Sequence, residues 1–336
     1  MKRGFFQALA CWGLMTWSAF AGEGARLSEP ETYRGMCDAS AAVAIGTNFF
    51  VVANDEDNIL RTYRRHPGGM PISTIDLGRF LEVKGKSPET DIEAATMVSN
   101  RIYWITSHGR NAKGKDSPDR HRFFATDVVA GDNGVKLIPA GRPYHTLLLD
   151  FALDARLARY GLVWASRLAP KQPGALNIEG LAAMPGGGLL LGFRNPIPGG
   201  RALLLPLLNP EGLVRGESAR FGEAIQINLG GLGVRSLGYE NGRYLIIAGP
   251  SGAGGKSKLY SWRGAGTEAA LIESVDFSGL NPEGMAFEMV DGHREYFILS
   301  DDGTMKVAGI DCKRLKDPTQ RRFRGYGLRL EGNGAD

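Results

Sequence analysis

The feature that most constrains this chain is a short acidic phrase that recurs just before pairs of apolar segments. Its clearest copies are Thr90-Asp91-Ile92-Glu93-Ala94-Ala95, Leu176-Asn177-Ile178-Glu179-Gly180-Leu181-Ala182 and Leu280-Asn281-Pro282-Glu283-Gly284-Met285-Ala286. Degenerate copies occur at Met36–Ala41 and at Gly233–Gly238, in which we align Ser40 and Ser236 with Glu93, Glu179 and Glu283. A unit that recurs about every fifty residues indicates a repeat fold, and it places equivalent polar residues at equivalent points of each unit.

Each copy of the phrase is followed by the alternating apolar pattern of several strands. The innermost strands are expected at Ala41–Ile45, Ala94–Val98, Leu181–Met184, Arg235–Tyr239 and Met285–Met289. Five groups of four strands are typical of a β-propeller, in which each blade needs neighbours to cover its faces. We therefore predict an all-β fold, a single β-propeller of five blades, with six blades as the alternative.

The spacing between the second and third repeats is longer than the others. Residues 144–160 show a helical spacing of apolar positions without strand alternation. We predict an inserted helix near Thr146–Tyr160, between the second and third blades; a degraded extra blade is the alternative. The outer strands of the fifth repeat are expected at Met305–Asp311 and Arg322–Leu330, and Arg26–Tyr33 is expected to add to this blade and close the ring.

The first residues have the pattern of a secretory signal. Lys2 and Arg3 precede an apolar segment, and Ala19-Phe20-Ala21 fits a cleavage site. We predict a signal peptide over 1–21, a propeller domain over 22–330 and a disordered tail over 331–336, with the mature protein periplasmic or secreted. No other apolar run is long enough to span a membrane, so no membrane insertion is expected.

Charge and cysteine content set further bounds on the mature chain. Removing Lys2 and Arg3 lowers the formal net charge from +4 to +2, which gives no indication of nucleic-acid binding. The expected state is a monomer. Cys11 leaves with the signal, so Cys37 and Cys312 remain, near the two ends of the repeats. In an oxidising compartment such a pair is expected to form a disulfide that closes the ring; two separate buried thiols are the alternative.

Propeller topology would gather the acidic phrases into one site, because inner strands begin and second strands end at the same face near the channel. Strand starts contribute Asp38, Asp91, Glu93, Asn177, Glu179, Arg235, Asn281 and Glu283. Strand ends contribute Asn54, Asp55, Glu56, Ser107, His108, Arg110, Arg194, Asn195, Ser251, Ser300, Asp301 and Asp302. Crowded carboxylates repel, so a cation, nearby arginines or raised pKa values must offset the cost.

These residue types allow definite roles. Carboxylate and amide oxygens suit Ca²⁺ or Mg²⁺, and the candidate ligands are Glu93, Glu179, Asn177, Asn281, Glu283 and Asp302. The candidate catalytic residues are Glu93, Glu179, Glu283 and His108. The candidate groups for an anionic substrate are Arg110, Arg194, Arg235 and Asn195. The alternative for each residue is structural, because Asp, Asn and Gly recur at propeller turns, where they bind backbone groups.

Two of the phrases also carry a resemblance to known proteins. Asn177-Ile178-Glu179-Gly180-Leu181-Ala182 with Gly192-Phe193-Arg194-Asn195-Pro196, and Asn281-Pro282-Glu283-Gly284-Met285-Ala286 with Leu299-Ser300-Asp301-Asp302-Gly303, resemble an uncharacterised bacterial secreted family (DUF3616-type). The resemblance implies a propeller and no established activity. The N-x-E-G-[LM]-A phrase is more loosely similar to esterase-like phytase propellers and, more loosely still, to calcium-dependent lactonase propellers.

Two hypotheses for function follow. The first is a non-catalytic propeller whose carboxylate-rich channel face binds a small anionic ligand or an envelope protein. The alternative is a metal-assisted hydrolase of a small anionic ester, phosphoester or lactone. No unmistakable nucleophile occurs in the sequence, so whether the protein is an enzyme is left open.

Overall fold

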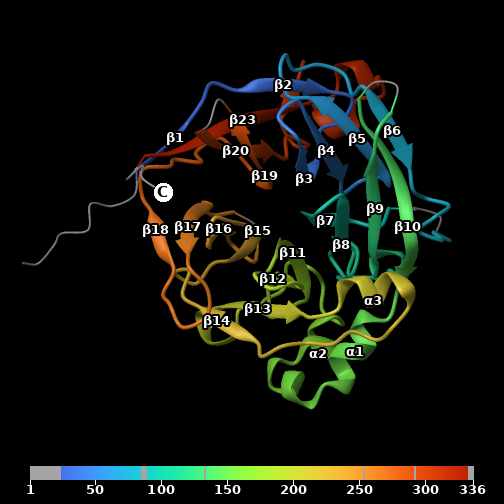
Figure 1. The fold of residues 1–336 in the computed structure, drawn as a ribbon, viewed down its shortest axis with the longest axis vertical. Helices are drawn as coiled ribbons and strands as arrows, with labels where there is room; N and C mark the ends of the chain where they lie inside the picture. Colours follow the sequence, from blue (N-terminus) through green and yellow to red (C-terminus); the bar gives the residue numbers. More distant parts are fainter. Residues whose placement is uncertain (1–23, 85–88, 132–133, 253, 291–292, 332–336) are drawn as a thin grey trace, which may run out of the picture.

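Five β-sheets arranged as blades around a central axis form the core of this protein (Figure 1). The computed structural model describes residues 24–84, 89–131, 134–252, 254–290 and 293–331. The five-bladed all-β propeller predicted from the repeats is confirmed. The predicted signal peptide, with its cleavage site after Ala21, lies outside the described residues.

The first four blades each run outward from the channel in chain order. Blade 1 contains β3 (Ala39–Ile45), β4 (Phe49–Asn54), β5 (Ile59–Arg64) and β6 (Ser73–Asp76). Blade 2 contains β7 (Ile92–Val98), β8 (Arg101–Thr106), β9 (Phe123–Val129) and β10 (Lys136–Tyr144). Blade 3 contains β11 (Asn177–Ala183), β12 (Leu189–Asn195), β13 (Ala202–Leu207) and β14 (Ile225–Ile227). Blade 4 contains β15 (Gly233–Glu240), β16 (Arg243–Gly249), β17 (Lys258–Trp262) and β18 (Ala270–Ile272).

Blade 5 joins the two ends of the chain. Its inner strands are β19 (Pro282–Val290), β20 (His293–Ser300) and β23 (Arg322–Glu331). The outer edge of β23 pairs with β1 (Gly24–Leu27) and β2 (Glu31–Arg34), so N-terminal strands close the ring as expected. The outer strand expected over Met305–Asp311 is wrong: that segment forms only a small hairpin, β21 (Lys306–Val307) with β22 (Ile310–Asp311). Glu331 ends β23, and the rest of the predicted tail lies outside the described residues.

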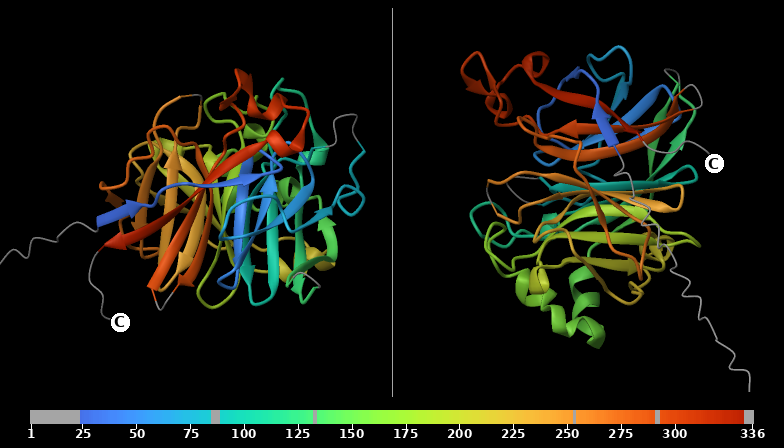
Figure 2. Two further views of the ribbon diagram at one scale, coloured as in Figure 1. Left: turned by 90° about the horizontal axis from the view of Figure 1, so that it is seen from above. Right: turned by 90° about the vertical axis from the view of Figure 1, so that its left-hand side faces the viewer.

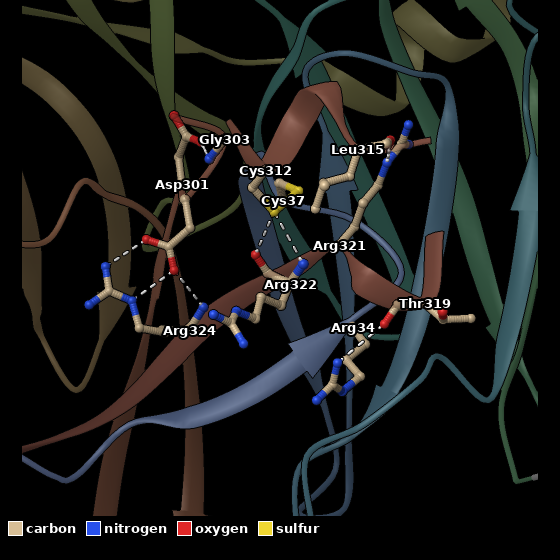
Figure 3. Close-up of a disulfide and its surroundings, with 11 residues drawn as sticks. Arg34, Cys37, Asp301, Gly303, Cys312, Leu315, Thr319, Arg321, Arg322 and Arg324 are labelled. Atoms are coloured by element: carbon tan, nitrogen blue, oxygen red, sulfur yellow. Dashed lines mark hydrogen bonds and ion pairs between the residues drawn. A yellow bond between two sulfur atoms is a disulfide. The ribbon is translucent and has the colours of Figure 1, made fainter. Parts of the chain in front are cut away.

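The predicted disulfide between Cys37 and Cys312 is confirmed (Figure 3). Cys37 precedes β3, and Cys312 begins the short helix η4 (Cys312–Arg314) after the small hairpin. The two Cα atoms are 5.9 Å apart although 275 residues separate them in sequence. The bond therefore links the first and last blades beside the strands that close the ring.

Apolar side chains form a separate core cluster between each pair of adjacent blades. The cluster between blades 5 and 1 shows the pattern, because Tyr33 of β2 contacts Phe50 of β4 and Phe297 of β20. Four similar clusters lie between the remaining neighbours. Each blade is thus stabilised by burial against two neighbours, the main favourable contribution to such a fold.

The inserted helical segment between blades 2 and 3 is confirmed, although it is broken into short pieces. It consists of α1 (Leu147–Leu153), the 3₁₀ helix η2 (Ala155–Tyr160) and α2 (Leu162–Ala165). Figures 1 and 2 show that it lies outside the ring of blades. A further helix, α3 (Pro210–Arg215), packs on blade 2 and was not predicted. No helix of the described chain is long and apolar enough to span a bilayer.

Candidate functional site

A β-bulge occurs at the same point of all five inner strands. In each pairing of an inner strand with its neighbour, one residue near the strand start is skipped. The skipped residues are Ser40, Glu93, Glu179, Arg235 and Glu283. A bulge leaves its extra residue out of the ladder and redirects the side chain. The fold therefore repeats one special position in each blade, and four of the five positions carry a charged side chain.

The register in blade 4 corrects the sequence interpretation. Ser236 was aligned there with the repeated glutamates, but it pairs directly with Ile247, and Arg235 is the bulged residue. Blade 4, whose copy of the phrase has no acidic residue, thus supplies a cation at the equivalent position. The degenerate phrase contains no glutamate to align, which is why its register was one residue off.

Arg235 brings two of the bulged glutamates together. Its Nη2 contacts Oε1 of Glu283, and its Nε lies 3.8 Å from Oε2 of Glu179. Arg235 and Glu179 are buried, and that Nε and that Oε2 have no hydrogen-bond partner. Burial lowers the pKa of the Arg235 guanidinium, and the Glu179 carboxylate opposes the shift. A buried cation shared by two carboxylates offsets part of the cost of burying all three charges.

Glu179 is held by two further groups from its own blade. Arg194, at the end of β12, places Nη1 2.7 Å from Oε1, and Asn177 donates to the same oxygen at 2.7 Å. The Arg194 guanidinium also donates to the carbonyl oxygens of Pro250 and Gly252. We call Glu179, Arg194, Arg235 and Glu283 the arginine half of the site.

Glu93, the bulged residue of blade 2, is held differently. Its carboxylate has no hydrogen-bond or ion-pair partner among the described residues. Burial, followed by the charges of Glu179 and Asp91, raises the pKa of Glu93 well above its ordinary value. The side chain therefore carries a proton more readily than an ordinary glutamate, or else requires a cation from outside the protein.

A second group of carboxylates lies where blade 1 meets blade 5. Burial and the charge of Asp301 raise the pKa of Asp38 to about 7, and raise that of Asp55 well above its ordinary value. Asp38 is only 5% exposed, and Oδ1 of Asp55 is buried without a partner. Asp301 accepts hydrogen bonds from Asn281 and Gly303, at 2.8 Å each. We call Asp38, Asp55, Glu93 and Asp301 the acidic half of the site.

Glycine is required beside this group. A Cβ atom at Gly303 would lie 1.7 Å from Oδ1 of Asp38, so the backbone passes against the carboxylate. The nearest lysine, Lys313, bonds instead to Glu56 at 2.6 Å, and it opposes the raised pKa of Asp38 only from a distance. The acidic half therefore contains no carboxylate in contact with a cationic side chain of the described chain.

Other candidate residues from the sequence have separate neighbours. His108 is fully buried, hydrogen-bonds through Nδ1 to the Thr106 carbonyl and stacks on His121. Burial and the charge of His121 lower the pKa of His108 to about 3, so its imidazole is neutral near pH 7. No contact joins it to the three bulged glutamates within the described chain.

Three more candidates bind their own blade or loop. The Arg110 guanidinium donates to the carbonyls of Ser166 and Gly114, and Asn195 bonds to Gly174 and Gln172. Asp302, expected at the channel edge, accepts two bonds from the Arg324 guanidinium of β23, at 2.8 and 2.7 Å. The structure thus gathers Arg194 and Arg235 with the glutamates and leaves these three polar side chains in other contacts.

The expected ligand set does not fit a metal ion in its present arrangement. Among residues 24–331, apart from the undescribed gaps, no group of three or more His, Cys, Asp or Glu side chains is arranged to hold one. Glu179, Glu283 and Asp302 already accept from arginines, so a cation bound there would face a guanidinium. A role for Ca²⁺ or Mg²⁺ stays a prediction.

Comparison with solved structures returns propellers at low identity. The PQQ-bound aldose sugar dehydrogenase of Streptomyces coelicolor is 11% identical, with a TM-score of 0.47, over 93% of this chain and 99% of that one. The β-xylosidase/α-arabinofuranosidase CoXyl43, from a compost metagenome, is 12% identical, with a TM-score of 0.45, over 93% and 96%. The arabinanase Arb43A of Bacillus subtilis is 11% identical, with a TM-score of 0.41, over 89% and 95%. Similarity at this level carries no information on chemistry.

Sequence comparisons point to one family. No curated protein matches the chain. The matched region of the family model runs from β10 to the first residue of β19, so it contains Glu179, Arg194 and Arg235 and ends before Glu283. Over residues 140–282 the chain matches the model of a family described as a protein of unknown function, DUF3616, which confirms the resemblance predicted from the sequence.

Proposed function

We propose that the channel face is a binding site for a small ligand and that the acidic half receives a positively charged group of that ligand. An ammonium or guanidinium group would supply the cation that Asp38, Asp55 and Glu93 lack within the protein. Ion pairing there would relieve the repulsion among these carboxylates and let them ionise. The ligand is therefore an organic cation or a molecule with a cationic end.

The observation that carries this proposal is the absence of a partner for the Glu93 carboxylate. It lies at a bulge that the fold repeats in every blade, and no side chain of the described residues forms an ion pair with it, although the charge of Arg194 opposes the rise of its pKa. Glu93 is half-buried and Asp38 is buried; carboxylates withdrawn from water without a partner are costly, which favours a role in binding.

An anionic ligand, expected from the sequence, is less well supported. Arg235 is shared by Glu179 and Glu283, and Arg194 is bonded to Glu179 and to two carbonyl groups. The Arg194 guanidinium therefore has three donors occupied, and the Arg235 guanidinium lies between two carboxylates. A ligand carboxylate or phosphate would compete with these glutamates and would add negative charge next to Glu93.

Calorimetric titration with matched small probes tests the proposal. The probes are alkylammonium and alkylguanidinium ions, the corresponding carboxylates, inorganic phosphate, and CaCl₂ and MgCl₂ as a separate arm. We expect the organic cations to bind and the carboxylates and phosphate to fail. Glu93→Gln is expected to weaken cation binding at least tenfold, which corresponds to about 1.4 kcal/mol.

The control is Asp76→Asn, which removes one exposed carboxylate from β6 and leaves the channel untouched. It should bind the probes like the parent. Preferential binding of anions, or equal losses in the two variants, would contradict the proposal. Binding confined to CaCl₂ or MgCl₂ would replace the organic cation by a metal ion.

A second candidate function is hydrolysis by an acid–base pair of carboxylates. It rests on the contrast between Glu93, whose pKa is raised, and Glu179, which accepts from Arg194 and Asn177. Two neighbouring carboxylates in unlike environments can act as general acid and general base. Glu93 would protonate a leaving group, and Glu179 would activate water.

A screen of chromogenic glycosides, esters and phosphoesters tests this second function. Activity that is lost in both Glu93→Gln and Glu179→Gln would support it. Activity unaffected by either substitution would rule out this pair. Export of the protein and an envelope protein partner stay predictions; fractionation of cells and cross-linking test them.

A further inference from the structure

The helical insert between blades 2 and 3 exposes large apolar side chains to solvent. Leu149 and Leu153 of α1 are 56% and 74% exposed, and Trp164 of α2 is 61% exposed. Helices α1 and α2 contact each other and lie outside the ring of blades (Figures 1 and 2). We call the surface formed by Leu149, Leu153 and Trp164 the insert tip.

Helix α1 has apolar residues on both of its faces. Its inward face is held by Leu147 and Phe151, which are buried in the core cluster between blades 2 and 3. Its outward face contains Leu149, Ala152 and Leu153, spaced as one stripe of a helix, and all three are exposed. A helix of a water-facing insert normally carries polar residues on this side. The outward stripe is therefore not explained by the fold of the blades.

Two exposed arginines of the insert lack a carboxylate partner within the described chain. These are Arg159 and Arg167, at the end of η2 and just after α2. Two acidic residues here that are not buried contact Arg156: Asp154 bonds to it at 2.6 Å, and Glu223 lies 3.4 Å from it. Asp150 is buried and accepts from the Tyr144 hydroxyl. The Arg159 guanidinium lies over the Tyr160 ring, 4.9 Å from its centroid. The tip therefore combines leucine and tryptophan with two arginines that have no carboxylate partner in the described chain.

We propose that the insert tip docks on the surface of an anionic lipid bilayer. Leucine and tryptophan side chains of a short amphipathic segment enter the boundary between headgroups and acyl chains, and flanking arginines and lysines bind the anionic headgroups. The helices of the insert project from the ring of blades (Figures 1 and 2), which leaves them accessible to a flat surface. The proposal concerns a surface remote from the channel and does not depend on the ligand proposed above.

Charge distinguishes a bilayer from a second copy of the chain. In a twofold-symmetric dimer through this tip, each copy would present the same surface to the other. Arg159 and Arg167 would then face like charges, which opposes association. An acidic protein partner satisfies the charge as well as a lipid does, and the test separates the two.

Sedimentation with vesicles tests the proposal on the purified protein without the predicted signal segment 1–21. Vesicles of phosphatidylcholine alone are compared with vesicles that also contain phosphatidylglycerol. We expect binding to the anionic vesicles that weakens with added salt. Leu153→Ser with Trp164→Ala should reduce the bound fraction at least tenfold, and Arg159→Gln with Arg167→Gln should remove the preference for anionic lipid.

The matched control is Leu271→Ser, which removes an exposed leucine from β18 and should bind vesicles like the parent. Circular dichroism and thermal unfolding confirm that each variant is folded. Failure of the parent to bind anionic vesicles overturns the proposal, as does binding that all variants retain. A concentration-dependent dimer lost in the Leu153 and Trp164 variant would overturn it in favour of a second copy. Binding to an acidic protein alone would overturn it in favour of a protein partner.

Discussion

The two halves of the channel face use the same structural position and treat charge in opposite ways. In the arginine half, the bulged Glu179 and Glu283 share the bulged Arg235, and Arg194 adds a second cation. In the acidic half, the bulged Glu93 and its neighbours Asp38 and Asp55 lack such a partner, and their pKa values are raised. One half is internally neutralised, and the other is not.

This difference indicates which carboxylates serve the fold and which are free for a ligand. Removing one member of a buried charge pair lowers the stability of the fold, because the other charge is then left buried without a partner. Carboxylates without a partner do not stabilise the fold in this way, so a role in binding a ligand explains them better. The predictions below test the contrast, beginning with the largest effect.

The seam between blades 5 and 1 lies in the acidic half, where Asp38 and Asp301 repel each other. The adjacent disulfide is expected to hold it closed. Replacing Cys37 and Cys312 by Ser should lower the free energy of unfolding by roughly 5 kcal/mol, the chain-entropy value for so long a loop. Urea unfolding without reductant measures the change. Equal stability of parent and variant would show that the blade core alone closes the ring.

The arginine half should depend on Arg235. Replacing it by Met leaves Glu179 and Glu283 without their shared cation, and the expected loss is about 3–5 kcal/mol. The control is Arg156→Gln, which removes an exposed pair with Asp154 and should cost less than about 1 kcal/mol. Both are measured by urea unfolding at pH 7. Similar small losses in the two variants would contradict the distinction between the halves.

The acidic half should show the opposite pH dependence to a salt-bridged site. Asp38 has a pKa of about 7 in the folded protein and an ordinary value of 3.8. Between these values the folded state binds more protons than the unfolded state, so its contribution to stability falls as pH rises. Asp38→Asn removes this loss. The free energy of unfolding of the variant should therefore rise relative to that of the parent between pH 4 and pH 8, by up to about 4 kcal/mol at about 1.4 kcal/mol per pKa unit. Urea unfolding at a series of pH values measures the difference. A difference in the free energy of unfolding that stays constant with pH would contradict the raised pKa of Asp38.

The smallest effect is expected for Glu93 in the absence of ligand. Its carboxylate has no partner to lose, and Glu93→Gln removes repulsion from Glu179 and Asp91. We expect stabilisation on the order of 1 kcal/mol at pH 8, measured by urea unfolding. A loss of stability would mean that the ionised carboxylate is held by the protein itself.

The sequence predicted the repeat architecture and its closure because both depend on patterns that recur along the chain. The phrase before each inner strand predicted that Glu93, Glu179 and Glu283 take equivalent positions at the starts of their strands. The pairing of charges could not be predicted, because it depends on side chains from different blades. Arg235 was one residue out of alignment, since its copy of the phrase has no glutamate to mark the bulge.

Burial also separated residues that the sequence treated alike. His108 and Arg194 both follow second strands, but His108 is fully buried against His121, whereas Arg194 reaches Glu179. The outer edge of blade 5 was misplaced because a short alternating segment, Lys306–Asp311, forms a hairpin of its own. Local pattern cannot tell such a hairpin from an edge strand.

The central claim is that the acidic half is completed by a cation from outside the protein. Titration calorimetry with the tightest-binding organic cation of the screen, at pH 6.5 in two buffers of different ionisation enthalpy, tests it most directly. Binding should release protons, because a cation beside Asp38 and Glu93 lowers their raised pKa values. Glu93→Gln should weaken binding and reduce the number of protons released. Binding without proton release, or with equal affinity in the variant, would contradict the claim.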